Sequence, residues 1–258
     1  MITMGIDVGN LLCKVVVMEG DRVVARGVAP TTGNVASEID LLVDGVLREA
    51  GLSRSVVDFC AATGSGSGYL EHVDFHEDAL TCTAAAGAFL LPDINMVIDI
   101  GGQSITAILL DEDGDVVNFM RNDKCASGSG RFLEVMCAAV GVGVEMIDRV
   151  AASARSPVPI SSQCGVFAES EVITHVNAGE DPADIVAGLC HAVANIVSAQ
   201  ARRFSEGDNY TITGSVAKIG TVTGLVSTKL GRTYTPFPGD PGLATAMGAA
   251  ILAEMEAG

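Results

Sequence analysis

Short apolar runs that end in glycine turns recur along this chain at a fixed distance. Residues 5–9 contain Asp7 and end in Gly9. Residues 97–102 repeat this order of apolar residues, aspartate and glycine 92 residues later. Each copy is followed by a second apolar run, a turn and a third run. Runs of this kind, bounded by turn residues, are typical of buried β-strands. Because a solenoid has a much shorter period, the pattern predicts two similar halves.

Helical periodicity follows these strands. Across residues 34–50, Ile39, Val46 and Leu47 fall on one face, and Gly51 suits a C-cap. The same reasoning predicts helices at 78–90, 131–140, 144–154, 167–178, 181–206 and 243–256, and strands at 56–62 and 210–213. Strands that alternate with helices in both halves indicate an α/β fold. We expect an N-terminal half at 1–94, a C-terminal half at 95–242, and a helix at 243–258 that packs back on the N-terminal half.

Composition narrows the classes of function. The net charge of −17 argues against binding to nucleic acid and to anionic membranes. Without a run of about 20 apolar residues or a basic N-terminal segment before an apolar one, we expect neither a membrane span nor a signal peptide. The odd count of seven cysteines, without close pairing, is typical of reduced thiols in the cytoplasm rather than of a disulfide scaffold.

The two Asp-x-Gly turns are the first candidate site. A carboxylate at the end of a strand can order Mg²⁺ through water, and the glycine lets backbone N–H groups approach phosphate oxygens. One such turn is common by chance, but two in register are not. We expect Asp7 and Asp99 to face each other across a cleft, where they order Mg²⁺ and an attacking water.

Three nearby side chains each have two interpretations. Gln103 either positions water or is a simple turn residue. Lys14 either meets a phosphate or is a solvated strand lysine. Glu134 either touches a ribose or serves as a surface or capping residue.

A third turn completes the pattern, because Gly214 and Ser215 follow a strand and precede Lys218, where the chain could pass beside an adenosine. The three segments together resemble the actin, sugar kinase and Hsp70 superfamily of ATPases, whose duplicated, ribonuclease H-like halves close over ATP. The resemblance implies phosphate loop one at 7–14 with Gly9 and Asn10, phosphate loop two at 99–106 with Gly101 and Gly102, and the adenosine loop at 214–218.

Two cysteines stand apart from the others. Cys125 and Cys164 each precede a predicted helix, whose free N–H groups and dipole stabilise a thiolate. Two cysteines cannot complete a four-thiolate site, but two copies of the chain can, across a twofold axis. Spacing alone leaves open two unrelated buried cysteines, and the lack of a Cys-x₂-Cys pair argues against an ordinary zinc ribbon. We expect the other five cysteines to be buried.

The segments around these cysteines, NDKCASGSGRFLE and SSQCGVFAESEVI, closely resemble the ATP-dependent activators of 2-hydroxyacyl-CoA dehydratases and the ATPase subunits of benzoyl-CoA reductase, the BadF/BadG/BcrA/BcrD type. The resemblance implies a homodimer with one [4Fe-4S] cluster between subunits, held by Cys125 and Cys164 of each. It further implies coupling of ATP hydrolysis to one-electron transfer, a dehydratase or reductase partner, a donor such as ferredoxin or flavodoxin, and an anaerobic source.

This chain departs from the family pattern at the nucleotide loops. Asn10, Leu11 and Leu12 stand where small hydroxyl residues are usual, and Ser104 replaces an aspartate after Gln103. Residues 63–67 lack the usual Tyr and Arg, and the adenosine turn lacks paired glycines and a later Asn. These changes leave open a paralogue with weakened ATPase activity, acting as one subunit of a heteromer or as a non-catalytic subunit. A small-molecule kinase of the same superfamily is a further alternative, but it would leave the cysteine segments unexplained.

Overall fold

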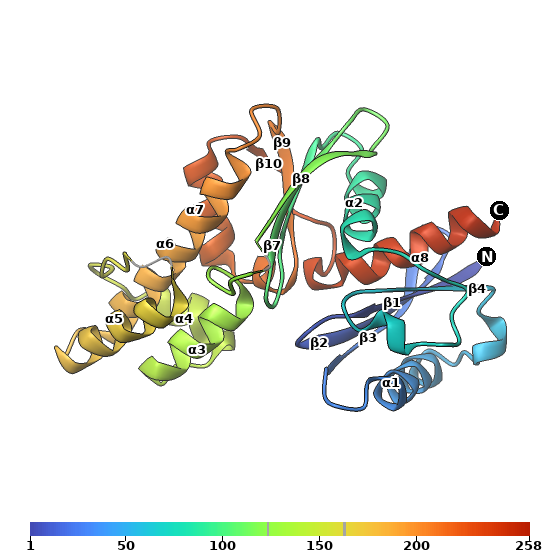
Figure 1. Cartoon of the computed structure of the whole chain (residues 1–258), viewed down its shortest axis with the longest axis horizontal. Helices are drawn as coiled ribbons and strands as arrows, with labels where there is room; N and C mark the ends of the chain where they lie inside the picture. Colours follow the sequence, from blue (N-terminus) through green and yellow to red (C-terminus); the bar gives the residue numbers. More distant parts are fainter. Residues whose placement is uncertain (123, 162–163) are drawn as a thin grey trace.

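Two five-stranded sheets form the two lobes of a computed structural model that describes residues 1–122, 124–161 and 164–258 (Figure 1). Sheet one has the order β3-β2-β1-β4-β5 and sheet two the order β8-β7-β6-β9-β10. The strands of sheet one are β1 (Ile2–Val8), β2 (Leu12–Glu19), β3 (Arg22–Pro30), β4 (Phe59–Thr63) and β5 (Phe75–His76). Those of sheet two are β6 (Met96–Ile100), β7 (Ile105–Leu110), β8 (Val116–Asn122), β9 (Asn209–Thr213) and β10 (Thr233–Tyr234).

The two sheets repeat each other in register as well as in order. Asp7 lies opposite Lys14 on the neighbouring antiparallel strand, and Asp99 lies opposite Thr106 in the same way. Each second strand also carries an irregularity, after Val17 in sheet one and after Leu109 in sheet two, again 92 residues apart. The predicted α/β fold with duplicated halves is therefore confirmed.

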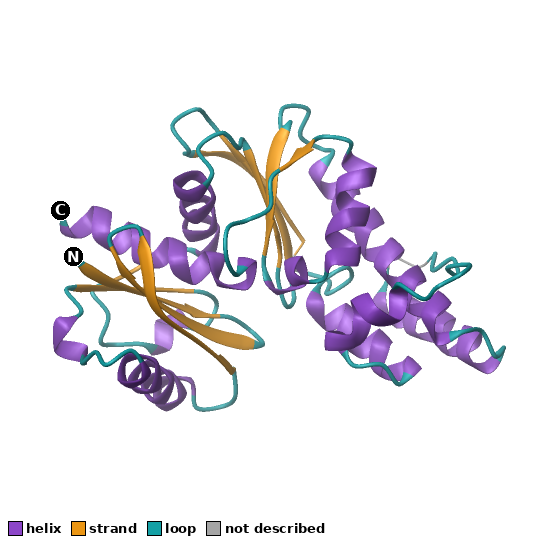
Figure 2. Ribbon diagram, turned by 180° about the vertical axis from the view of Figure 1, so that it is seen from behind, coloured by secondary structure: helices purple, strands orange, loops and turns teal. Residues whose placement is uncertain are grey.

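Helices cover both faces of each sheet (Figure 2). They are α1 (Val35–Glu49), α2 (Ala79–Leu90), α3 (Gly130–Val140), α4 (Ile147–Ala151), α5 (Gly165–Asn177), α6 (Pro182–Ala201), α7 (Gly220–Leu230) and α8 (Ala244–Ala257). On sheet one, α1 packs with its apolar face over β1 and β2. On sheet two, α3, α6 and α7 enclose the largest core. Helix α6 has the length and hydropathy of a membrane span, but 67% of that window is buried, as in a core helix.

The remaining face of each sheet is covered by a helix that belongs to the other half of the sequence. Helix α2 belongs to the first 94 residues, yet its Leu80 and Ala84 pack on sheet two. Helix α8 follows sheet two in the sequence, yet it packs on β1, β2 and β4 of sheet one. It lies so close to β1 that a Cβ atom placed on Gly5 would be 1.9 Å from the carbonyl oxygen of Ala246.

Helices α2 and α8, each of which covers the sheet of the other half, also contact each other. A Cβ atom placed on Gly248 would lie 1.6 Å from the carbonyl oxygen of Cys82, so α8 and α2 meet backbone to backbone at this point. The hydroxyls of Thr83 and Thr245 hydrogen-bond at 2.8 Å beside it. The α2–α8 contact thus joins the lobes behind the cleft.

Several predicted boundaries are wrong, and α7 was not predicted. The predicted helix at 181–206 ends at Ala201, and that at 144–154 divides into a 3₁₀ turn (Val144–Met146) and α4. A 3₁₀ turn also occupies Arg54–Val56, so β4 starts later than expected. Helix α7 is rich in Gly, Thr and Val, which are weak helix formers. Its first turn is stabilised by Asp148, whose carboxylate accepts hydrogen bonds from the N–H groups of Gly220 and Thr221.

Candidate functional site

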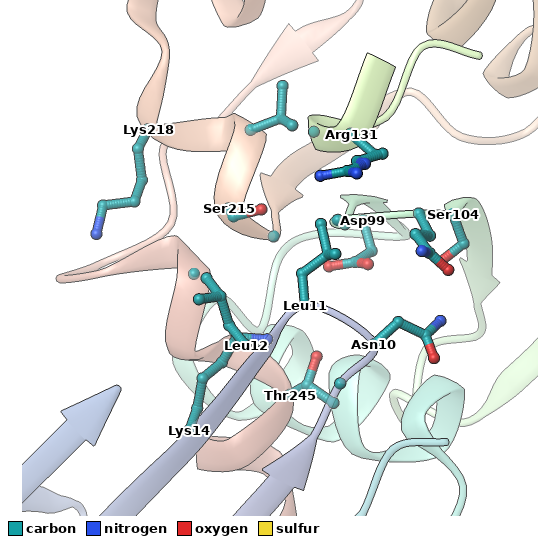
Figure 3. A pocket seen from close by; sticks show the side chains of 18 of the residues that line it. Asn10, Leu11, Leu12, Lys14, Asp99, Ser104, Arg131, Ser215, Lys218 and Thr245 are labelled. Carbon is teal, nitrogen blue, oxygen red and sulfur yellow. The ribbon is translucent and has the colours of Figure 1, made fainter. Parts of the chain in front are cut away.

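A cleft of about 740 Å³ lies between the lobes (Figure 3). It is lined by all the residues that the sequence suggested for a nucleotide and its metal: Asp7, Gly9, Asn10, Lys14, Asp99, Gly101, Gly102, Gln103, Glu134, Gly214, Ser215 and Lys218. Three distant stretches of sequence therefore meet at one cavity. Sequence reasoning assigned no role there to Arg131, Asp148 or Thr245, which also line the cleft.

Asp7 and Lys14 form a buried ion pair at the floor of the cleft. The ammonium of Lys14 lies 2.6 Å from Oδ2 of Asp7, and the two side chains are 16% and 6% exposed. Burial alone would lower the pKa of Lys14, but the charge and hydrogen bond of Asp7 outweigh it, so the pKa of Lys14 is raised. Lys14 is therefore a charged partner of Asp7 and not a solvated strand lysine.

Asp99 has no lysine of its own. Its Oδ1 accepts a hydrogen bond of 2.9 Å from Thr213 on the neighbouring strand. Burial raises the pKa of Asp99, and the hydrogen bond from Thr213 and the charge of Lys14 only partly offset this. The negative charge of Asp7 adds to the rise, which shows that the two carboxylates lie close enough to interact. A cation between them would favour the ionised form of both.

The two glycine turns are closed by their own backbones. The N–H of Gly9 donates to the carbonyl of Leu12 at 3.2 Å, and the N–H of Gly101 donates to that of Ser104 at 2.9 Å. These two N–H groups are therefore engaged within the turns. Phosphate donors at this end of the cleft must come from other backbone or side-chain groups.

The third turn closes the cleft from the second lobe. Gly214 has a φ of +88°, and a Cβ atom there would lie 2.4 Å from the carbonyl oxygen of Ile100. Its N–H donates to the carbonyl of Pro241 at 2.9 Å. Lys218, at the end of the following 3₁₀ turn (Ser215–Lys218), forms an ion pair of 2.9 Å with Asp240.

Glu134 lies at the rim of the cleft and pairs with Arg131 at 2.8 Å, with both side chains about half exposed. The N–H of Arg131 donates to the carbonyl of Gly102 at 2.8 Å, and that of Gly130 donates to the carbonyl of Gly101 at 3.0 Å. The start of α3 is thereby attached to the second phosphate turn. Arg131 lies within the sequence segment around Cys125 that resembles the activator family. That position is the signal by which sequence reasoning could have found it.

The same backbone bonds connect the cleft to Cys125, five residues before Gly130. Ser127 and Ser129 between them are buried, and Ser129 Oγ donates to the carbonyl of Ala126 at 2.6 Å. Gly128 has a φ of +83° and packs tightly against Ile105. The cysteine loop is therefore a short, packed connection between the cleft and the surface.

Cys125 and Cys164 are exposed, and the other five cysteines are buried, as predicted. The pKa of Cys125 is lowered, first by the hydroxyl of Ser127, whose Oγ lies 3.0 Å from Sγ, and further by the N–H groups of Ser127 and Gly165. Gly165 directly follows Cys164 at the start of α5, so the structure brings the two cysteines together. Gln163 and Ser162 lie outside the described residues.

Burial has the opposite effect on the other thiols. It raises the pKa of Cys60, Cys82 and Cys190 to about 12 and that of Cys137 to about 11. Within the described ranges, no group of three or more His, Cys, Asp or Glu side chains could hold a metal ion. A single chain therefore offers two exposed thiols and no complete metal site in its described part.

Helix α5 begins at Gly165, so Glu169 and Glu171 lie beyond its first turn. The carboxylate of Glu171 accepts hydrogen bonds from the N–H and hydroxyl of Ser161. Glu171 thus ties the segment before Cys164 to the helix after it.

The sheet order and the cleft define a two-lobed protein with the ATPase fold shared with the ROK family of sugar kinases. Comparison with protein families is more specific, because the BadF/BadG/BcrA/BcrD ATPase family matches residues 4–253. The chain belongs to this family.

Individual relatives agree with that assignment. The (R)-2-hydroxyglutaryl-CoA dehydratase activating ATPase of Acidaminococcus fermentans is 38% identical over 89% of this chain and 88% of its own. One of the subunits of benzoyl-CoA reductase from Thauera aromatica is 34% identical over 73% of this chain and 68% of its own. The structure of the activator of 2-hydroxyisocaproyl-CoA dehydratase from Clostridium difficile, with bound ADPNP, superposes with a TM-score of 0.94 at 33% identity, covering 100% of this chain and 96% of that one.

Proposed function

We propose that this protein is an ATP-hydrolysing activator that delivers single low-potential electrons to a partner enzyme, a 2-hydroxyacyl-CoA dehydratase or a reductase of the benzoyl-CoA type. One observation carries the proposal. A polyphosphate-type cleft and a pair of exposed thiols lie on one chain, and the backbone bonds of Gly130 and Arg131 connect them. The names of the relatives, which are dehydratase activators and part of a reductase, support the same function.

In the cleft, we assign Mg²⁺ and the attacking water to Asp7 and Asp99. Lys14 forms an ion pair with Asp7. Burial disfavours the charged form of Asp99 and raises its pKa, and a divalent cation beside it would favour that charged form. Gln103 lines the same cleft, and we assign it the orientation of that water. Ser215 and Lys218 belong to the turn we assign to adenosine, and Glu134 lies on the side assigned to the ribose.

The exposed thiols fit a shared [4Fe-4S] cluster. Cys125 and Cys164 are accessible and lie beside each other, and hydrogen bonds lower the pKa of Cys125 as a thiolate ligand requires. Two copies of the chain would supply the four thiolates. When bound, the cluster supplies a site that accepts and releases one electron. The hydroxyl of Ser127 and the N–H of Gly165 are this chain's own donors to the sulfur of Cys125.

Coupling between the two sites follows from the packed loop between them. A nucleotide that binds the two states of the dimer with different affinity shifts their equilibrium. Because α3 begins on the second phosphate turn, a change in that turn moves the segment that ends at Cys125. A low-potential protein such as ferredoxin or flavodoxin would supply the electron.

A second candidate function is favoured by the first turn. Leu11 and Leu12 line the cleft and offer no side-chain donor to phosphate. A cluster-bearing paralogue with slow ATP turnover, acting as one subunit of a heteromeric reductase, would retain the thiols and tolerate this loss.

The deciding experiment is anaerobic purification, followed by analysis of iron and acid-labile sulfide. We expect about four irons per two chains, and loss of iron in Cys125→Ser/Cys164→Ser. Absence of iron after anaerobic reconstitution would overturn the electron-transfer function. A second assay measures Mg²⁺-dependent ATP hydrolysis, which we expect in the activator and expect to be abolished in Asp7→Ala. The slow paralogue would instead hold iron but turn over little ATP.

A further inference from the structure

Leu11 occupies the space between the two phosphate turns. It projects from the first turn toward the second lobe, on the side of Asp99 (Figure 3). A Cβ atom placed on Gly102 would lie 3.0 Å from Cδ1 of Leu11 and 3.3 Å from its Cγ. The leucine therefore rests on the glycine backbone of the opposite turn, and this contact crosses from one lobe to the other.

The backbone of Leu11 is held firmly. Its carbonyl accepts a hydrogen bond of 2.9 Å from the N–H of Thr31, and the hydroxyl of Thr31 donates to the carbonyl of Gly9 at 2.7 Å. Gly9 in turn bonds to Leu12 across the turn. Because the turn is fixed at both ends, the side chain leaves Gly102 by rotating or by separation of the lobes, and not by movement of the loop.

We infer that Leu11 closes the phosphate end of the cleft and sets the affinity of this protein for polyphosphates. This inference rests on the proposed nucleotide site. A phosphate group between the turns needs polar donors or water on every side, and an isobutyl group offers neither. Binding must therefore displace Leu11 from Gly102 and leave its methyl groups beside a charged ligand. The cost falls on the phosphates alone, because the base is assigned to the turn at Gly214 and the ribose to the side of Glu134.

The test compares ligands as well as variants. We would measure binding of ATP, ADP and adenosine, each with Mg²⁺, by titration calorimetry to the wild type, Leu11→Ala and Leu11→Ser. We expect the variants to bind ATP and ADP at least about tenfold more tightly, or about 1.4 kcal/mol, while adenosine changes by less than about twofold. The serine variant should bind at least as tightly as the alanine variant, because its hydroxyl can donate to phosphate.

The matched control is Leu41→Ser on the exposed face of α1, where the side chain is 74% exposed and does not line the cleft. It should leave every affinity unchanged. Equal or weaker ATP binding in Leu11→Ala would overturn the role of Leu11 while leaving the nucleotide site intact. A gain for adenosine as large as that for ATP would also overturn it. If no variant bound ATP or ADP, the proposed function would fail, and this inference with it.

Discussion

Lys14 stands directly across the β1–β2 ladder from Asp7, with its ammonium 2.6 Å from the carboxylate. The equivalent position in the second half is Thr106, opposite Asp99. The duplicated halves therefore differ in charge at the same register position. One acidic residue carries its own counter-ion at that position, and the other faces a neutral side chain.

Replacement of Lys14 should be costly. Lys14→Met leaves the buried carboxylate of Asp7 without its partner, and we expect a loss of about 3 kcal/mol in the free energy of unfolding. Urea denaturation measures it. The control is Arg22→Met, which removes the exposed Arg22–Glu19 pair and should cost at most about 1 kcal/mol. A similar small loss for both variants would show that Asp7 does not need Lys14.

Asp99 should make the nucleotide-free protein less stable as pH rises. Its pKa is raised in the folded state, so the folded protein binds more protons than the unfolded chain between the ordinary aspartate pKa of about 3.8 and the raised value. Stability therefore falls as pH increases through that window. Asp99→Asn lacks this contribution, and its stability relative to the wild type should grow across the window and then level off.

A second variant tests the direction of this effect. Thr213→Val removes the hydrogen bond that lowers the pKa of Asp99, so the window should extend to higher pH. Thermal unfolding as a function of pH, without nucleotide or divalent cation, provides the comparison. A constant difference between Asp99→Asn and wild type at every pH would contradict the raised pKa.

Thiol labelling should divide the seven cysteines into two classes. At pH 8 a buried thiol with a pKa of about 12, such as Cys60 or Cys82, is ionised in about one molecule in 10⁴. Iodoacetamide should therefore modify only Cys125 and Cys164 in the folded, metal-free chain. Peptide mapping by mass spectrometry identifies the sites, and the Cys125→Ser/Cys164→Ser variant should remain unlabelled until it is denatured.

The contact between α2 and α8 should tolerate no added atom at Gly248. Gly248→Ala places a methyl group against the carbonyl of Cys82, and we expect a loss of about 2 kcal/mol or more from forced separation of the helices. Gly45→Ala in α1 is the matched control, because open space surrounds that position. It should stabilise the protein by about 0.5–1 kcal/mol. Equal effects of the two substitutions on chemical denaturation would refute the close contact.

Local pattern predicted the repeated strands well, because Asp7 and Asp99 lie in apolar runs whose length and turns have few other interpretations. The local pattern did not decide the role of Lys14. The residues next to Lys14 in the sequence do not reveal the strand pairing that places it against Asp7. Helix α7 was missed for a related reason. Its start depends on Asp148, which lies 72 residues before Gly220. Helix α2 is apolar on all sides, so no face indicated that it would cover the second sheet.

The exchange of α2 and α8 has a consequence for the newborn chain. Sheet one receives its second covering helix only after the entire second lobe has been translated, more than two hundred residues after β1. At about 5–20 residues per second, Val16 and Met18, which α8 covers in the folded protein, wait on the order of ten to fifty seconds on an uncovered face of the sheet. The first lobe thus cannot complete its core until α8 has left the ribosome, and we expect this interval to be when the protein depends most on chaperones.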